Sequence, residues 1–197
     1  MILKQWESVD NTDRGEKILI RKQLLQKISS PYILECYAGY GVIYRECYKD
    51  HPCVGLDLKP IDDGRVIISI DNRKFLKSTD LGKYNVFDLD AYGSPWQQWL
   101  IILKRRQFKA KESVAIFITD GLDFKMRMSS LPSGLRPYVG LPAGMNIPLL
   151  NLHHDFINSL VVSGSVKAAG LEVVHALSAK NPRCNMKYYG LILKKCN

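Results

Sequence analysis

Short apolar runs alternate with stretches whose apolar residues recur about every 3.6 positions, and this alternation limits the possible folds most strongly. Five runs with the composition of buried strands lie at residues 32–36, 52–56, 65–70, 84–89 and 113–119. Helical periodicity is found at residues 15–29, 42–49, 96–108 and 151–169. Strands that alternate with helices in this way form a mostly parallel sheet with helices on both faces.

The end of the chain breaks this alternation. Residues 172–177 and 187–193 predict two further strands joined directly by a loop, which is typical of an antiparallel hairpin. The sequence therefore predicts an α/β fold: a doubly wound, Rossmann-like, mostly parallel seven-stranded sheet with a C-terminal antiparallel hairpin. Trp96 and Trp99 lie three apart on a predicted helix and are expected in the core.

The length of the chain fits one domain, 1–197, that can bury a sizeable core. Residues 1–30 are expected to form an N-terminal helical extension. Residues 120–150 contain several glycines and prolines and are expected to form an irregular insertion on the substrate side.

The composition describes a basic globular protein. Lys and Arg number 28 against 19 Asp and Glu, which gives a net charge of +9. Such an excess favours a nucleic-acid partner, RNA or DNA, although solubility alone would also explain it. No apolar run approaches the ~20 residues that span a bilayer, and residues 1–13 lack the apolar centre of a signal peptide, so we expect a cytoplasmic protein without a membrane partner. The five cysteines are odd in number and form no C-x-x-C pair, which favours reduced thiols and predicts no metal site.

The strongest local signal is Glu35-Cys-Tyr-Ala-Gly39-Tyr-Gly41, directly after the first predicted strand. Glycines let the backbone turn tightly and let a ligand approach it closely. A carboxylate at the strand end, here Glu35, can accept hydrogen bonds from a hydroxyl or ammonium group. A simple strand-to-helix turn explains the two glycines equally well.

Acidic residues also end the next two predicted strands. Asp57 follows Glu35 by about 20 residues, the spacing of a ribose-binding acid, and Leu58 beside it can form a wall for an adenine ring. Asp71 and Asn72 end the third strand, where they can accept a hydrogen from an adenine amine or cap a helix. Since α/β sheets bind ligands beyond the carboxyl ends of their strands, these residues predict a single nucleoside-like ligand.

The Glu35–Gly41 motif resembles the aromatic-Ala-Gly-x-Gly form of motif I in nucleic-acid methyltransferases. From about Tyr32 to Leu193, the chain resembles class I S-adenosylmethionine-dependent methyltransferases, the reversed terminal hairpin included. The resemblance implies that S-adenosylmethionine is the cofactor, with Glu35 and the glycines beside its methionine part, Asp57 at the ribose and Asp71 at the adenine amine. The residues predicted to bind the cofactor are Glu35, Tyr37, Gly39, Gly41, Asp57, Leu58, Asp71, Asn72 and Asp88.

A second motif, Phe87-Asp-Leu-Asp90-Ala-Tyr-Gly-Ser-Pro95, resembles the Asp-Pro-Phe-Gly-Ser-Pro motif of tRNA guanine N2-methyltransferases. It is also loosely similar to the Asp/Asn-Pro-Pro-Tyr/Phe motif of enzymes that methylate exocyclic amines, with Ala91 where a proline is expected. Such an amine is a poor nucleophile, and an acceptor at its N–H bonds makes it more reactive. We therefore predict that Asp90 and Tyr92 are catalytic, Tyr92 as a stacking face worth ~1–3 kcal/mol. Electrostatic support of the loop is the alternative for Asp88 and Asp90.

The predicted substrate-binding residues are Tyr92, Ser94, Pro95, Asp120, Lys125 and Arg127. The favoured function is methyl transfer from S-adenosylmethionine to an exocyclic amine of a nucleic-acid base, in RNA, tRNA included, before DNA. A partner protein could supply target recognition. Methylation of a protein or a small molecule is one alternative. A non-catalytic nucleic-acid-binding module on the same scaffold is another, and Ala91 keeps it open.

Overall fold

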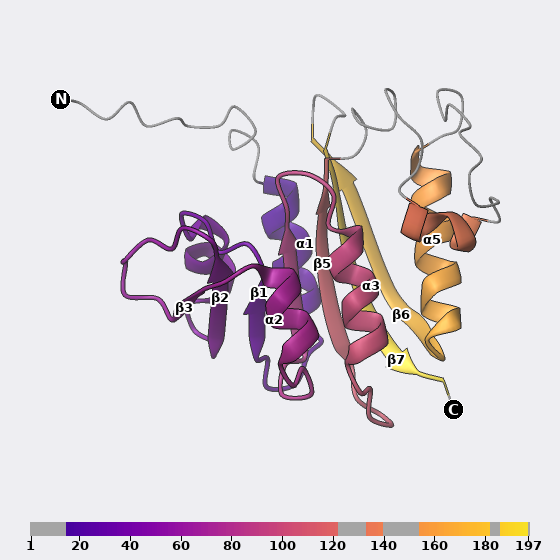
Figure 1. Ribbon diagram of the computed structural model, residues 1–197, viewed down its shortest axis with the longest axis horizontal. Coiled ribbons are helices and arrows are strands. Elements are labelled where there is room, and N and C mark those ends of the chain that lie inside the picture. Colours follow the sequence, from indigo (N-terminus) through magenta and orange to yellow (C-terminus); the bar gives the residue numbers. More distant parts are fainter. Residues whose placement is uncertain (1–14, 122–132, 140–153, 182–185, 197) are drawn as a thin grey trace.

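The computed structural model describes residues 15–121, 133–139, 154–181 and 186–196, built around one mixed sheet (Figure 1). The seven strands follow the order β3-β2-β1-β4-β5-β7-β6. In chain order they are β1 (Ile33–Glu35), β2 (Cys53–Asp57), β3 (Ile67–Ser69), β4 (Val86–Asp90), β5 (Val114–Asp120), β6 (Leu171–Lys180) and β7 (Lys187–Lys195). Strands β1 to β5 pair in parallel, while β7 runs antiparallel to both β5 and β6. The predicted sheet and its terminal hairpin are confirmed.

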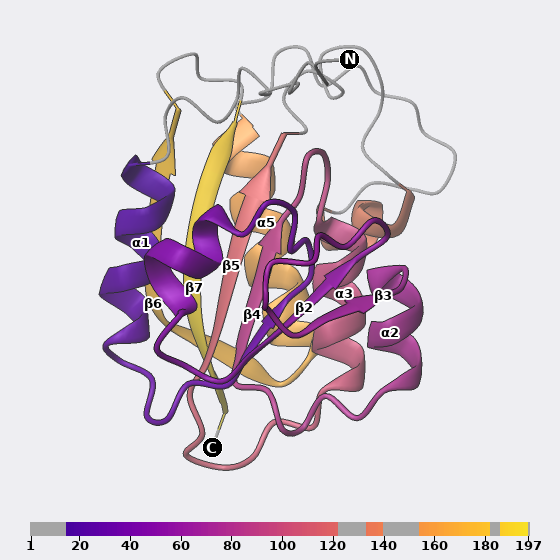
Figure 2. The ribbon, with the colours of Figure 1, turned by 90° about the vertical axis from the view of Figure 1, so that its left-hand side faces the viewer.

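Helices cover both faces of this sheet, as predicted (Figures 1 and 2). Helix α1 (Gly15–Leu25) and the π-helix η2 (Tyr44–Tyr48) lie on one face. The other face carries α2 (Asn72–Ser78), α3 (Trp96–Arg105) and α5 (His154–Ala168), with the 3-10 helix η3 (Ser133–Val139) next to α5. Neighbouring residues of β1 show why both faces must be covered: Ile33 packs with α1 and Leu34 packs with α2 and α3, and neither is exposed.

Trp96 and Trp99 lie in the core, which confirms their prediction. Their rings meet edge to face at 6.2 Å. The indole N–H of Trp96 donates to Asp120 Oδ2 at 3.1 Å, and that of Trp99 donates to Ser165 Oγ at 2.9 Å. Buried indoles need such partners. Asp120, predicted to bind substrate, is fully buried and holds Trp96 in place.

The helix predicted at residues 15–29 is present as α1, which ends earlier, at Leu25. It packs against η2, β5, β6 and β7. Its Lys17 and Arg21 reach two aspartates of β4. Among the described residues, no helix is long and apolar enough to cross a membrane.

For Asp71 and Asn72, capping of a helix was the predicted alternative to contact with an adenine amine. The structure confirms the cap, at the start of α2. The Asp71 side chain accepts the backbone N–H of Arg73 at 2.8 Å, the usual arrangement of an N-cap. The predicted insertion at 120–150 is described only in part, and Lys125 and Arg127 lie outside the described residues.

The connection between β2 and β3, residues 58–66, contains no helix. Parallel strands are usually joined by a crossover of a dozen or more residues that includes a helix. The shorter path brings Arg65 back over the turn that follows β1, with consequences for the site.

Candidate functional site

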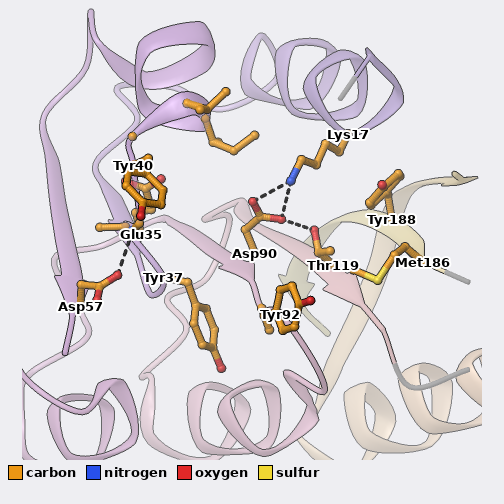
Figure 3. A pocket seen from close by; sticks show the side chains of 16 residues that line it. Lys17, Glu35, Tyr37, Tyr40, Asp57, Asp90, Tyr92, Thr119, Met186 and Tyr188 are labelled. Carbon is orange, nitrogen blue, oxygen red and sulfur yellow. Dashed lines mark hydrogen bonds and ion pairs between the residues drawn. The ribbon is translucent and has the colours of Figure 1, made fainter. Parts of the chain in front are cut away.

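A first pocket of about 390 Å³ lies at the carboxyl ends of β1, β4 and β5, in the size range of small-molecule sites (Figure 3). Its walls come from α1, from the glycine turn after β1, from the loop after β4 and from the start of β7. They comprise Lys17, Glu35, Tyr37, Ala38, Gly39, Tyr40, Gly41, Val42, Ile43, Asp57, Asp90, Ala91, Tyr92, Thr119, Met186 and Tyr188.

A second pocket of about 340 Å³ lies beside it, at the ends of β1, β2 and β3. Its lining residues are Cys36, Tyr37, Leu56, Asp57, Leu58, Ile70, Asp71, Asn72, Arg73 and Gln98. Tyr37 and Asp57 line both pockets. The two pockets are therefore adjacent.

Arg65 holds the turn of Gly39 and Gly41, which joins β1 to η2. Gly39 and Gly41 have φ angles of +41° and +70°, a conformation that side chains disfavour. The Arg65 guanidinium donates to the carbonyl oxygens of Ala38 at 2.8 Å and Gly39 at 2.7 Å. A Cβ atom at Gly41 would lie 2.6 Å from Arg65 Cζ. Glycine is thus required at position 41 both by conformation and by space, and the role of Arg65 was not predicted from the sequence.

Asp57 joins the glycine turn to β2. Its Oδ2 accepts the N–H of Gly39 and its Oδ1 accepts the N–H of Lys59, both at 2.9 Å. A carboxylate has about four acceptor positions, so two remain for a ligand. A pair of neighbouring hydroxyl groups, as on a ribose, fits that capacity.

Glu35 ends β1 as a buried carboxyl group with a free acceptor. It is 2% exposed, and its Oε2 has no hydrogen-bond partner among the described residues, with Arg65 at 3.7 Å. Burial, together with the negative charge of Asp88 on the neighbouring strand, raises the pKa of Glu35 to about 9, although Arg65 opposes the shift. A cationic group of a ligand would favour the ionised form of Glu35. An ammonium group could donate a hydrogen bond to this carboxylate, whose Oε2 receives none from the described residues.

Asp88 does not line either pocket, and this corrects the prediction that it binds the cofactor. Arg21 holds its two oxygens at 2.8 and 2.7 Å, and the Tyr48 hydroxyl donates to Oδ2. The Asp88 and Arg21 side chains are almost fully buried. Asp88 therefore anchors α1 and η2 to the sheet, beneath the floor of the first pocket.

Asp90, two residues further along β4, does reach the first pocket (Figure 3). Lys17 Nζ lies 3.1 and 2.9 Å from its two oxygens, and Thr119 donates to Oδ1. Burial would raise the pKa of Asp90, but Arg21 and Lys17 outweigh it and hold that pKa below its usual value. Three described bonds leave about one acceptor position on this carboxylate. Lys17 was missed because nothing in the sequence relates it to a residue so far along the chain.

The loop after β4 is fixed by backbone hydrogen bonds. The N–H of Ala91 donates to Leu89 O at 2.8 Å, closing a three-residue turn around Asp90, and Gly121 N–H donates to Gly93 O at 2.9 Å. A proline at position 91 could not make the first of these bonds. Tyr92 is 80% exposed at the edge of the first pocket. Ser94 and Pro95, both predicted to bind substrate, line neither pocket and precede α3.

Asp71 and Leu58 form the outer part of the second pocket. Leu58 is 70% exposed and offers an apolar wall. The Asp71 carboxylate is engaged by Arg73 through its side chain and its backbone N–H, which hold the pKa of Asp71 at about 2. Of the cofactor-binding residues predicted, the structure thus brings all but Asp88 to the two pockets.

The sequence matches no protein-family model and no curated protein. Solved structures are similar in fold. N-methyltransferase NodS from Bradyrhizobium japonicum, crystallised with S-adenosyl-L-homocysteine, shares 11% identity at a TM-score of 0.53 over 98% of this chain and 92% of that one. The 1,6-didemethyltoxoflavin-N1-methyltransferase of Burkholderia thailandensis shares 13% at 0.52, over 94% and 80%. TYW2 of M. jannaschii, in complex with AdoMet, shares 8% at 0.52, over 93% and 78%.

Proposed function

We propose that this chain, which has the class I methyltransferase fold, binds S-adenosylmethionine across its two pockets and transfers the methyl group to an exocyclic amine of a nucleic-acid base. The observation that carries the proposal is the shared wall: Tyr37 and Asp57 line both pockets. A nucleoside in the second pocket would thus continue into the first. Two solved structures of similar fold contain S-adenosylhomocysteine, which supports a ligand of this kind here.

The donor set fits this cofactor group by group. Leu58 and the apolar lining of the second pocket suit an adenine ring, and Asp57 keeps acceptor positions for the ribose hydroxyls. The unpartnered, buried carboxyl of Glu35 suits the ammonium of the methionine part. Gly39 lines the first pocket without a Cβ, and the space that a Cβ would take there is open, so a ligand can approach the backbone closely.

Asp90 and Tyr92 would prepare the acceptor. S-adenosylmethionine would supply an electrophilic methyl group on a positively charged sulfur. The S–CH₃ bond would break as the N–CH₃ bond forms, S-adenosylhomocysteine would leave, and the methylated nitrogen would lose its extra proton to water. Asp90 would accept an N–H of the substrate amine at its remaining acceptor position and so direct the nitrogen lone pair along the line of transfer. Its lowered pKa suits a hydrogen-bond acceptor better than a strong base. Much of the rate would come from this positioning.

Charge and exposed aromatic rings support a nucleic-acid substrate. The chain carries a net charge of +9. Tyr40 and Tyr92, which are 66% and 80% exposed, both line the first pocket. Exposed rings stack on unpaired bases, at ~1–3 kcal/mol per base. A base that has left its helix, or one in a single strand, is the form that such a pocket would accept.

A second candidate is an amide or amine of a protein or a small molecule. Lys17 makes two described hydrogen bonds, both to Asp90, so it keeps an N–H beside the free acceptor position of that carboxylate. A donor beside an acceptor also complements a carboxamide. One fold neighbour binds a small molecule, 1,6-didemethyltoxoflavin.

Calorimetry with S-adenosylhomocysteine tests cofactor binding. We expect micromolar affinity for the wild type and a loss of at least tenfold for Asp57→Ala, whereas Asp62→Ala, at an exposed acid of the same loop, should bind as the wild type does. No heat at millimolar ligand would refute the proposal. Transfer of a tritiated methyl group to total RNA, DNA and protein then tests the substrate: label in RNA or DNA is expected, and label in protein alone would favour the second candidate.

A further inference from the structure

Lys17 and Asp90 lie side by side on the wall of the first pocket (Figure 3). Asp90 Oδ1 has no acceptor position left, because it accepts from Lys17 at 3.1 Å and from the Thr119 hydroxyl. Asp90 Oδ2 accepts from Lys17 at 2.9 Å and from no other described residue. The acceptor position that this carboxylate keeps is therefore on Oδ2, the oxygen nearer to the lysine.

Lys17 keeps a donor next to that acceptor. Its ammonium has three N–H bonds, and both of its described hydrogen bonds go to Asp90, so at least one N–H has no acceptor among the described residues. The Lys17 side chain is only 10% exposed, although it lines the pocket. An N–H in so enclosed a position normally has a partner, and a bound substrate can supply one.

The helix that carries Lys17 is held in place beneath the pocket. Arg21, one turn further along α1, donates to the carbonyl oxygen of Lys17 at 2.9 Å. The other donors of the same guanidinium hold Asp88 on β4, two residues before Asp90. The donor on α1 and the acceptor on β4 are thus positioned relative to each other before a substrate arrives, which lowers the entropic cost of binding to both.

A donor beside an acceptor selects among the bases that carry an exocyclic amine. In adenine and in cytosine, the ring nitrogen beside the amine on the Watson–Crick edge is an acceptor, so this edge complements the pair. In guanine, the ring nitrogen at that place carries a hydrogen and would set its N–H against that of the lysine. The acceptor on the other side of the guanine amine lies next to the glycosidic bond, where the sugar restricts access.

We propose that Lys17 is a specificity-determining residue, whose free N–H donates to the ring nitrogen beside the reacting amine while Asp90 Oδ2 accepts an N–H of that amine. The inference rests on the proposed function and narrows its substrate to adenine or cytosine. Guanine is rejected by the repulsion between two N–H groups. Lys17 acts on recognition of the base, and the methyl group still passes from sulfur to the amine nitrogen.

Methyl transfer to oligonucleotide pools of random sequence tests this contact without knowledge of the target sequence. The probes are RNA and DNA pools with adenine and cytosine, and matched pools with 1-deazaadenine and 3-deazacytosine, in which carbon replaces the ring nitrogen beside the amine. The ratio of the two rates should be at least tenfold lower in Lys17→Met than in the wild type. The intrinsic reactivity of each amine cancels in this comparison. Lys22→Met, on the same helix, half exposed and paired with Glu46, should keep the wild-type ratio.

A rate that falls equally on both kinds of pool in Lys17→Met would mean that the lysine only positions Asp90, and would overturn the inference. Digestion of the labelled natural pool to nucleosides gives a second readout, which needs the wild type alone and therefore decides even if Lys17→Met fails to fold. Label on adenine or cytosine is expected, whereas label on guanine overturns the inference and leaves the proposed function standing. Label in protein alone, or binding of S-adenosylhomocysteine without transfer to any nucleic acid, refutes the proposed substrate, and the inference falls with it.

Discussion

The two pockets share a wall but are built from different interactions. The first is surrounded by charged groups: Glu35 and Asp90 line it, Lys17 pairs with Asp90, and Arg21 with Asp88 lies beneath. The second depends at its inner end on neutral amides and apolar side chains. A ligand with a charged tail and a neutral ring matches that difference. It also implies that binding at the first pocket responds to pH, whereas binding at the second does not.

The largest effect should come from the ion pair beneath the first pocket. Asp88→Ala leaves the Arg21 guanidinium buried without its partner, which typically costs about 3–5 kcal/mol of unfolding free energy. Urea denaturation measures it. The double variant Arg21→Met with Asp88→Leu removes both charges and should recover most of the loss. A cost below about 1 kcal/mol for Asp88→Ala would mean that this charge is not structural.

The next effect concerns Glu35 and pH. Its folded pKa of about 9 lies above its ordinary value, so the stability that it contributes is complete at low pH and is lost as pH rises toward 9. Between pH 6 and 8 the wild type should lose up to about 3 kcal/mol relative to Glu35→Gln. Denaturation of both proteins at the two pH values checks the sign. A parallel response of the two proteins would contradict the raised pKa.

The same group should make cofactor binding release a proton. Glu35 is neutral in the free protein near pH 7 and is expected to ionise beside an ammonium. Calorimetry of S-adenosylhomocysteine in buffers with different ionisation enthalpies should therefore report proton release in the wild type and none in Glu35→Gln. Equal heats across the buffers would mean that Glu35 does not ionise on binding. The two pockets would then not differ in their response to pH.

A smaller effect is expected at Lys17. Lys17→Met removes a cation that lowers the pKa of Asp90, so that pKa should rise, while Arg21 continues to hold it down. Carboxyl NMR titration measures the shift. Lys22→Met is the matched control, because Lys22 lies on the same helix, half exposed, and pairs with Glu46. An unchanged Asp90 titration would place Lys17 outside its influence.

The smallest effect lies at the second pocket. Asp71→Ala removes the N-cap of α2, which typically costs about 1 kcal/mol. The affinity for S-adenosylhomocysteine should also fall modestly, because Asp71 lines the second pocket and keeps one acceptor position beside its three bonds from Arg73. Thermal unfolding and calorimetry measure the two quantities separately, and an unchanged affinity would show that the ligand makes no contact with Asp71.

Much of this arrangement could be predicted from the sequence, because strand ends meet at one edge of a parallel sheet. Glu35, Asp57 and Asp71 end three successive strands, and the sheet order places them together. Asp88 and Asp90 show where such reasoning stops. The two residues lie two positions apart on β4, so their side chains point to the same face of the sheet and the sequence does not distinguish them. Only Asp90 lines the first pocket, whereas Asp88 is buried below it.

The residues that the sequence did not reveal act across long separations. Lys17, Arg65 and Gln98 belong to α1, to the connection after β2 and to α3, and none lies in a recognisable motif. Each is recognised by its hydrogen-bond partners: Lys17 donates to a carboxylate, Arg65 to two carbonyl oxygens and Gln98 to a side-chain amide. Only the packed sheet brings these partners within reach.

The guanidinium of Arg65 fills the volume that a methyl group at Gly41 would need. Since the φ angle of +70° favours glycine as well, homologous chains are expected to keep glycine at position 41. Replacing the connection between β2 and β3 by a conventional helical crossover would then free the glycine turn as well, so the length of that segment is constrained by the turn that Arg65 holds.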